Sequence, residues 1–322
     1  MILEIVLFIA SCFILSWLSG HLVKTLVEIA KYLNWREFIV AFFVMAFAAS
    51  LPNLFVDLGA VLRGMPEVAL GDILGGNLVD LTVVSAIAVL FAPKEIKTDS
   101  KMVQGTAVFT SIIALLPLPL ILDGSLDRID GVILIFAFII YSFWLFSKED
   151  RFKKVYSTSK KKPIANFKNF TFNIFKIIFL LALLLLTSQW IVNSAKYFSQ
   201  NLGISLSLVG ILIVGIGNCF PEIYFSIITA RKGQGWLVLG DLMGAIIVPA
   251  TLVLGLIALI RPFVINDFSP FVIARVFLIF SAIFFLVVIR RGKSFTKKEG
   301  LFLLSIYILF LLTEIFRTSL PF

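Results

Sequence analysis

Long apolar stretches recur along the whole chain and restrict its fold more than any other feature of the sequence. A helix needs about 20 predominantly apolar residues to cross the hydrocarbon core of a bilayer. Charged residues make up only 15% of the chain, against about 25% in a typical soluble domain. The sequence therefore predicts an all-α integral membrane protein with ten transmembrane helices. We place them at Ile2–Val23, Phe38–Leu62, Val68–Phe91, Val103–Leu122, Gly131–Phe146, Ile174–Val192, Ile204–Ala230, Trp236–Ile260, Phe271–Ile289 and Leu301–Phe316.

The basic residues gather on one side of this topology. With the N-terminus placed outside, 22 of the 28 Lys and Arg residues fall inside and six outside. Cytoplasmic loops of membrane proteins carry this kind of excess. We therefore attribute the net charge of +9 to topology and expect no nucleic-acid partner. The prediction is a multi-pass protein of the cell membrane with an external N-terminus.

A basic, polar stretch divides the chain into two halves. Residues 148–173 lack a helical apolar stripe and are predicted to form a cytoplasmic linker between a first half, residues 1–147, and a second half, residues 174–322. Sliding the sequence by 169 residues aligns Ala46–Pro93 with Gly215–Pro262 without a gap, and 11 of the 48 positions are identical. Because each half holds an odd number of spans, the copies face opposite ways across the bilayer. Such inverted repeats place a binding site near the midplane.

The first helix of each copy carries groups that are unusual at bilayer depth. Pro52 and Pro221 are predicted to break these helices, because proline removes a backbone hydrogen bond, and the carbonyls freed in this way are natural cation ligands. Glu222 follows the second proline, and a carboxylate at the bilayer centre costs about 2.5–3.5 kcal/mol. We expect Glu222 to be paired, protonated or occupied by a cation. Asp57, one turn after Asn53 on the same helix face, is expected to present a second carboxylate to the same space.

The second helix of each copy adds further carboxylates. Small residues four apart, Gly71 and Gly75 in the first copy and Gly240 and Gly244 in the second, permit close backbone approach between membrane helices. Asp72 and Asp241 are expected near the starts of these helices, where they would cap free amides, with direct ion contact as the alternative. Asp80, present only in the first copy, is a better ligand candidate. Oxygen donors of this kind suit hard cations such as calcium or sodium, and the sequence offers no Cys/His set of the kind favoured by zinc or copper.

These motifs resemble those of the sodium/calcium exchanger superfamily, cation antiporters with ten helices and two α-repeats. The first family motif reads roughly G-T-S-L-P-E, and a basic-Gly turn and G-N-x-x-G-S-N-I-x-N/D follow it. The corresponding residues here are Ala48–Asn53, Arg63–Gly64 and Gly71–Asp80 in the first copy, and Gly217–Glu222, Lys232–Gly233 and Gly240–Pro249 in the second.

The resemblance implies a central cation site, with departures from the family pattern. Carried over residue by residue, the ligands are Asn53, Asp80, Glu222 and Pro249. Asn53 is an amide where the family has a carboxylate, and Pro249 has no side-chain donor. Asp57 stands where the family usually has Ser and is expected to return one lost charge. The remaining positions of the implied site are Ser50, which keeps a family hydroxyl, and Cys219, Gly76, Ala245, Ala49 and Asn218, which replace hydroxyl-bearing residues.

The function implied is secondary active cation antiport, with calcium exchanged for sodium by alternating access. Two alternatives stay open. One is a cation/proton antiporter in which Glu222 or Asp80 takes up the proton. The other is a transport-inactive scaffold of the same fold, favoured by the missing donor at Pro249. The expected partners are calcium, sodium, protons and the lipid bilayer. We expect no enzymatic activity, no cofactor and, without a P-loop pattern, no ATP.

Overall fold

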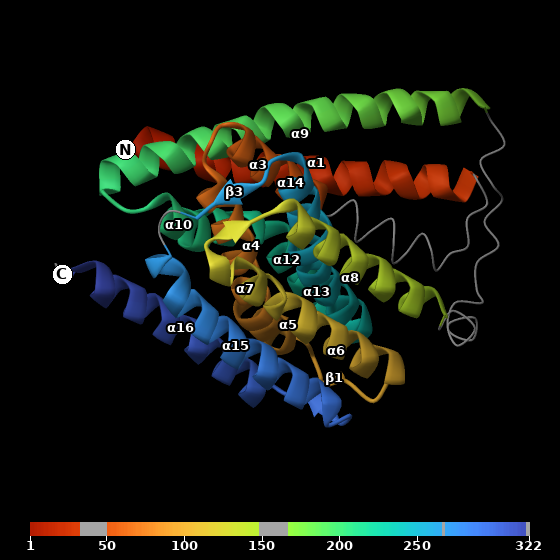
Figure 1. The fold of residues 1–322 in the computed structure, drawn as a ribbon. Coiled ribbons are helices and arrows are strands. Elements are labelled where there is room, and N and C mark those ends of the chain that lie inside the picture. Colours follow the sequence, from red (N-terminus) through yellow and green to blue (C-terminus); the bar gives the residue numbers. More distant parts are fainter. Residues whose placement is uncertain (33–49, 148–166, 266–267, 320–322) are drawn as a thin grey trace.

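The computed structural model describes residues 1–32, 50–147, 167–265 and 268–319, and almost all of these are helical (Figure 1). Within these ranges nine helical spans are long and apolar enough to cross a membrane. An additional apolar helix, Leu51–Leu62, ends the stretch expected at Phe38–Leu62, whose first part lies outside the described residues. The nine described spans coincide with the other nine expected, and the predicted all-α membrane fold is confirmed. Their bounds are Ile2–Leu26, Pro66–Phe91, Lys101–Asp123, Arg128–Ser147, Thr171–Leu202, Leu206–Arg231, Gly235–Ile260, Ser269–Arg290 and Lys297–Arg317.

Several spans consist of more than one helical element, because π-helical or 3-10 segments interrupt them. The elements of the first half are α1 (Ile2–Tyr32), α3 (Leu51–Leu62), α4 (Pro66–Val79), π-helical η2 (Asp80–Val84), α5 (Ser85–Phe91), β1 (Ile96–Lys97), α6 (Lys101–Leu115), α7 (Pro117–Leu120), 3-10 η3 (Ile121–Asp123), β2 (Ser125–Leu126) and α8 (Arg128–Ser147). Those of the second half are α9 (Phe167–Leu202), α10 (Leu206–Val209), π-helical η5 (Gly210–Val214), α11 (Gly215–Asn218), α12 (Phe220–Arg231), α13 (Gly235–Val248), π-helical η6 (Pro249–Val253), α14 (Leu254–Ile260), β3 (Phe263–Val264), α15 (Ser269–Arg290), β4 (Ser294–Phe295) and α16 (Lys297–Ser319).

The two halves repeat these elements in one register. Adding 169 to the bounds of α3, α4, η2 and α5 gives the bounds of α12, α13, η6 and α14, residue for residue. The same offset carries β2 onto β4 and the first residue of α8 onto that of α16. Gly64 and Gly233, also equivalent, have φ of 75° and 72°, a backbone conformation that glycine adopts without strain. The register read from the sequence therefore holds in the structure and extends beyond the aligned segment.

Two short antiparallel strand pairs show that the halves are inverted. β1 follows the third span and pairs with β4, which follows the ninth; β2 follows the fourth span and pairs with β3, which follows the eighth. When every span crosses the membrane, loops after odd-numbered spans lie on one side and loops after even-numbered spans on the other. Both pairings obey this rule. The fourth span and its counterpart, the ninth, therefore cross in opposite directions, as the inverted repeat predicts.

Helix α4 crosses the η5 segment with the two backbones in contact. A Cβ added at Gly75 would lie 2.3 Å from the carbonyl oxygen of Ile211, and one added at Gly71 would lie 2.6 Å from that of Ser207. Real Cβ atoms essentially never come closer than 3.0 Å. The close approach expected of these small residues is confirmed in the first copy, and it places the third and seventh spans at the centre of the fold. In the second copy the expectation is wrong for Gly240, where an added Cβ would meet no atom of the described structure within 4 Å.

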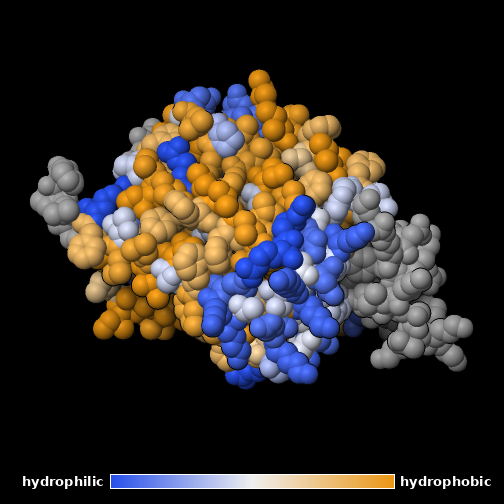
Figure 2. All heavy atoms as spheres, turned by 90° about the horizontal axis from the view of Figure 1, so that it is seen from below, coloured by the Kyte–Doolittle hydropathy of each residue, from blue (hydrophilic) through white to orange (hydrophobic). Residues whose placement is uncertain are grey.

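The other helices pack around this crossing in symmetric pairs. α1 runs along α9, and α6 along α15, while α8 packs on α14 as α16 packs on α5 (Figure 1). α9 begins at Phe167, inside the stretch expected as linker. Outward faces carry exposed aromatic side chains such as Trp17, Phe143 and Phe280. Figure 2 shows a broad hydrophobic surface beside a compact hydrophilic patch, a distribution suited to lipid on the flanks and water at the ends.

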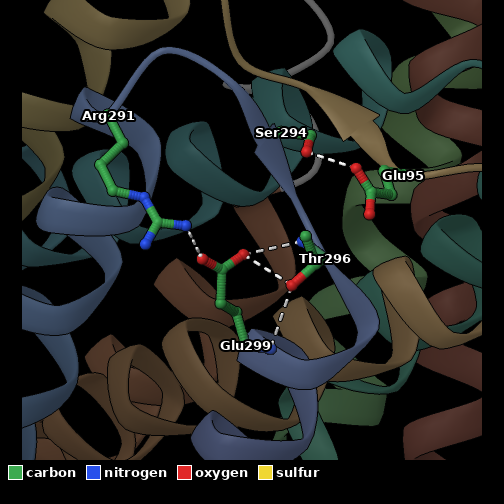
Figure 3. A network of polar contacts seen from close by, with 5 residues as sticks. All are labelled: Glu95, Arg291, Ser294, Thr296 and Glu299. Atoms are coloured by element: carbon green, nitrogen blue, oxygen red, sulfur yellow. Dashed lines mark hydrogen bonds and ion pairs between the residues drawn. The ribbon is translucent and has the colours of Figure 1, made fainter.

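Polar contacts fix the starts of the fifth helix in each half. At α16, the backbone amide of Thr296 donates to Glu299 at 2.8 Å, and the amide of Glu299 donates to the Thr296 hydroxyl at 3.4 Å (Figure 3). Asp127 and Asp130 make the same reciprocal pair at α8, with both bonds at 2.9 Å. This is the capping box that satisfies free amides at a helix start. Arg291 also pairs with Glu299 (Figure 3), which ties the loop after the ninth span to α16.

Candidate functional site

The two sequence-predicted prolines each start a helix. α12 begins at Phe220 with Pro221 in its first turn, and α3 begins at Leu51 with Pro52 in its first turn. In the seventh span the break is described on both sides, since α11 ends at Asn218 and Cys219 lies between the two helices. Proline cannot donate to the carbonyl four residues earlier. The break therefore exposes backbone carbonyls of this span at the level of Glu222.

Glu222, on α12, and Asp80, on η2, lie on elements from opposite halves of the chain that pack against each other. Both are buried, with 6% and 3% of their surfaces exposed, and their charges act on one another. Asp80 also lies beside the Cys219 thiol, which donates to the carbonyl oxygen of Gly76 at 3.7 Å. Glu222 Oε2 and Asp80 Oδ1 have no hydrogen-bond partner. We call Glu222 and Asp80 the central pair.

Asp72 and Asp241 do not cap their helices, so that expectation is wrong. Each is the seventh residue of its helix, and the N-cap positions are held by Met65 and Gln234 without side-chain cap bonds. The reason is that a seventh residue lies beyond the first turn, where the free amides of a helix start are found. Asp241 is half-buried and acts on the charge of Glu222. The alternative, direct contact of these aspartates with an ion, stays a prediction.

Asp72 instead belongs to a group of buried polar side chains between α3, α4 and α11. Its Oδ2 accepts a hydrogen bond of 2.5 Å from the amide of Asn218. Asp57, on α3, is fully buried and lies against Asp72, although no hydrogen bond of normal geometry joins the two carboxyls. We call Asp57, Asp72 and Asn218 the lateral group. The sequence had placed Asp57 with Glu222, whereas its charged neighbour in the structure is Asp72.

The remaining sequence-predicted residues line the same helices. Asn53 is half-buried on α3, and Ser50 is buried directly before that helix. Pro249 is buried at the start of η6, the position equivalent to Asp80 at the start of η2. Both equivalent sites are therefore π-helical, a geometry that is rare and frequent at functional positions.

No basic side chain compensates these carboxylates in the part of the chain that the structure describes. The ion pairs found there join Arg291 to Glu299 and Arg317 to Glu314, away from the central pair and the lateral group. Nor do three His, Cys, Asp or Glu side chains of the described ranges converge into a closed metal cage. Ionised carboxylates at this depth need a proton or a cation to offset their desolvation. These buried carboxylates therefore need a proton or a cation that can bind and leave.

Comparison with known proteins decides the family. A model of the sodium/calcium exchanger protein family matches residues 3–147 and 172–316, the two halves in turn. The chain belongs to the sodium/calcium exchanger family. Its relatives include the putative antiporter CaxA of Alkalimonas amylolytica, 26% identical over 303 residues that cover 92% of this chain and 93% of the relative. The sodium/calcium exchanger MaX1 of Methanosarcina acetivorans is 23% identical over 333 residues, 91% and 93% of the two chains.

Solved structures give the same fold. The sodium-calcium exchanger NCX_Mj superposes with a TM-score of 0.65 at 21% identity, with 99% of each chain covered. This exchanger is thus a multi-pass membrane protein built as two inverted repeats, and its family is one of cation antiporters and not of enzymes. The resemblance read from the motifs is confirmed at the level of fold and family.

Two polar residues of this exchanger were missed by sequence reasoning. Tyr307, on α16, is buried near Cys219, and its hydroxyl has no hydrogen-bond partner. Asn77, on α4, is buried with its amide nitrogen unpartnered. The position of Asn77 inside the second motif could have pointed to it. Nothing in the sequence singles out Tyr307, because only the packing of α16 against η2 brings it to the site.

Proposed function

We propose that this exchanger moves calcium against sodium by alternating access, with the central pair holding the calcium ion near the bilayer midplane. The observation that carries the proposal is the pair itself: Glu222 and Asp80 come from opposite halves, are buried at a helix break, and have no basic partner among the described residues. A site shared by two inverted repeats can open to either side when one set of helices rocks against the other.

The donor chemistry supports a hard cation. Calcium takes about six to eight oxygen ligands from carboxylates, amides, backbone carbonyls and water. Glu222 and Asp80 supply two carboxylates, and Pro221 leaves the carbonyl of Gly217 without its α-helical donor, so that this carbonyl accepts from the Cys219 amide instead. Asn53 adds an amide at the position equivalent to Glu222. The names of the relatives, a sodium/calcium exchanger and a putative antiporter, support the same reading.

We also propose an orientation in the cell membrane. The pairing of β1 with β4 puts the loops after the third and ninth spans on one side, and these loops are rich in lysine and arginine. Cytoplasmic loops carry that excess. The linker, which follows the fifth span, lies on the same side in this arrangement. The N-terminus is then outside, and the halves 1–147 and 174–322 are joined in the cytoplasm.

Calcium uptake into proteoliposomes tests the exchange. Purified protein is reconstituted, and radiolabelled calcium uptake is followed under an imposed sodium, proton or potassium gradient. We expect uptake driven by sodium leaving the vesicles, with little response to the other gradients. Uptake driven by protons alone identifies the cation/proton antiporter, and no uptake under any gradient at verified reconstitution identifies the inactive scaffold. Asp99→Asn, which removes a carboxylate from an exposed loop, is the matched control.

A further inference from the structure

The lateral group is a second set of buried carboxylates that the central pair does not explain. Asp57 and Asp72 have 0% and 2% of their surfaces exposed, and they lie against each other. Three of their four oxygens have no hydrogen-bond partner: both of Asp57 and Oδ1 of Asp72. The fourth accepts the amide of Asn218. Two adjacent carboxylates without a basic partner repel each other unless a positive charge lies between them.

The lateral group cannot share an ion with the central pair. Asp72 and Asp80 lie on one continuous helical span and are eight residues apart, which is about 12 Å along a helix axis. Two ligands of one calcium ion are at most about 5 Å apart, since each binds at about 2.3–2.6 Å. The side chains are too short to close that difference. The two groups are therefore separate positions along the third span, although the charge of Asp72 also acts on Asp80 and Glu222.

The second half lacks this arrangement, which provides an internal comparison. The 169-residue register places Ser226 opposite Asp57, Asp241 opposite Asp72 and Ala49 opposite Asn218. Ser226 is buried, but it offers a hydroxyl where Asp57 offers a carboxylate. A structural need of the fold would apply to both copies. The pair of carboxylates in one copy alone indicates a binding role.

We propose that Asp57 and Asp72, positioned by Asn218, form a second site that takes a small monovalent cation. The lateral group offers three free carboxylate oxygens in a space that is closed to bulk water. A monovalent cation between the carboxylates offsets their repulsion and leaves the central pair free for calcium. That this ion is the coupling cation of the exchange rests on the proposed function. The binding of the ion to the lateral group does not depend on the proposed function.

Ligand-dependent unfolding tests the site without transport. Thermal unfolding of the purified full-length protein is followed in sodium chloride, potassium chloride and choline chloride at equal ionic strength, over a range of pH, and radiolabelled sodium binding is measured in parallel. A bound cation raises the unfolding temperature in proportion to the logarithm of its concentration above Kd. The variants are Asp57→Asn, Asp72→Asn, Glu222→Gln and, as control, Asp99→Asn. Asp57→Ser introduces the residue type found at the equivalent position of the second half, Ser226.

We expect sodium to stabilise the wild type and Asp99→Asn. Asp57→Asn, Asp72→Asn and Asp57→Ser should each weaken sodium binding about tenfold or more, as the loss of a charged ligand does, while keeping calcium stabilisation. Glu222→Gln should lose calcium stabilisation and keep that of sodium. Stabilisation by potassium in place of sodium would still support a monovalent cation site at the lateral group, with potassium as its ion.

Three results would overturn the proposal. One is sodium dependence that is unchanged in both Asp57 variants. Another is stabilisation by low pH with no effect of sodium or potassium, which means that a proton occupies the pair. The third is loss of sodium and calcium binding together in Glu222→Gln, which means a single site. Absence of calcium binding in the wild type contradicts the proposed function. The sodium measurements then still test the lateral group on their own.

Discussion

Gly75→Ala probes the crossing of the third and seventh spans, on which the position of the whole site depends. The added Cβ would lie 2.3 Å from the carbonyl oxygen of Ile211, and the same position is 2.7 Å from its Cα. These are backbone atoms, so no side chain can rotate away. Ordinary contact begins at 3.4 Å, which means that the two helices must separate by roughly 1 Å.

The cost follows from that displacement. Overpacking of a close-packed interior costs about 1–3 kcal/mol, and the higher helix propensity of alanine offsets about 0.5–1 kcal/mol of it. We expect a net loss of stability of about 1–2 kcal/mol. In domains of 150–250 residues each kcal/mol lowers the unfolding temperature by about 2–4 °C, so a fall of several degrees should be measurable in detergent.

A matched substitution separates this effect from helix propensity. A Cβ at Gly20 on α1 meets no atom of the described structure within 4 Å. Gly20→Ala should therefore keep or slightly raise the unfolding temperature. Sodium-driven calcium uptake should fall in Gly75→Ala and stay normal in Gly20→Ala. An unfolding temperature for Gly75→Ala equal to that of the wild type, with normal uptake, would refute the backbone contact.

Three further predictions concern topology and the site. Cysteines introduced at Lys97 and Ser125, in β1 and β2, should be labelled by impermeant reagents from opposite sides of the membrane; labelling of both from one side contradicts the crossing pattern. Tyr307→Phe should weaken calcium affinity about two- to twelvefold, the effect of losing one hydrogen-bonding group worth about 0.5–1.5 kcal/mol, and unchanged affinity removes Tyr307 from the site. Asn53→Glu, which restores the family's carboxylate, should raise calcium affinity about tenfold, measured by calcium-dependent unfolding. When Asn53→Glu is combined with Asp57→Ser, sodium should still fail to stabilise the protein. Recovery of stabilisation by sodium would mean that Asp57 belongs to the central site.

The architecture could be predicted almost entirely from the sequence because it depends on local patterns. Apolar stretches define the spans, and the ungapped register from Pro52/Pro221 to Pro93/Pro262 defines the repeat. The structure repeats the helix bounds at the same offset. Gly71 and Gly75 pack as their spacing indicated, since close helix approach in a membrane depends on small residues in the sequence itself.

The grouping of the carboxylates could not be predicted in this way. Spacing along one helix placed Asp57 near Asn53, but the approach of α3 to α4 pairs it with Asp72. Asp72 was expected to cap a helix because its distance from the helix start was judged too short. Tyr307 reaches the site through packing between halves. Which carboxylates come together depends on how the spans are arranged around one another, and the residue types and their spacing do not specify that arrangement.

Calcium binding and transport by Glu222→Gln test the central pair most directly. The substitution keeps the side-chain volume and removes one charge from a buried site. The purified variant, at matched protein level and with a wild-type elution profile, is assayed for calcium binding and for sodium-driven calcium uptake beside Asp99→Asn. We expect calcium affinity to fall about thirtyfold or more, since removing one charge from a buried charged pair costs about 2 kcal/mol or more, and uptake to be lost. Wild-type binding and uptake in Glu222→Gln would contradict the assignment of the central pair.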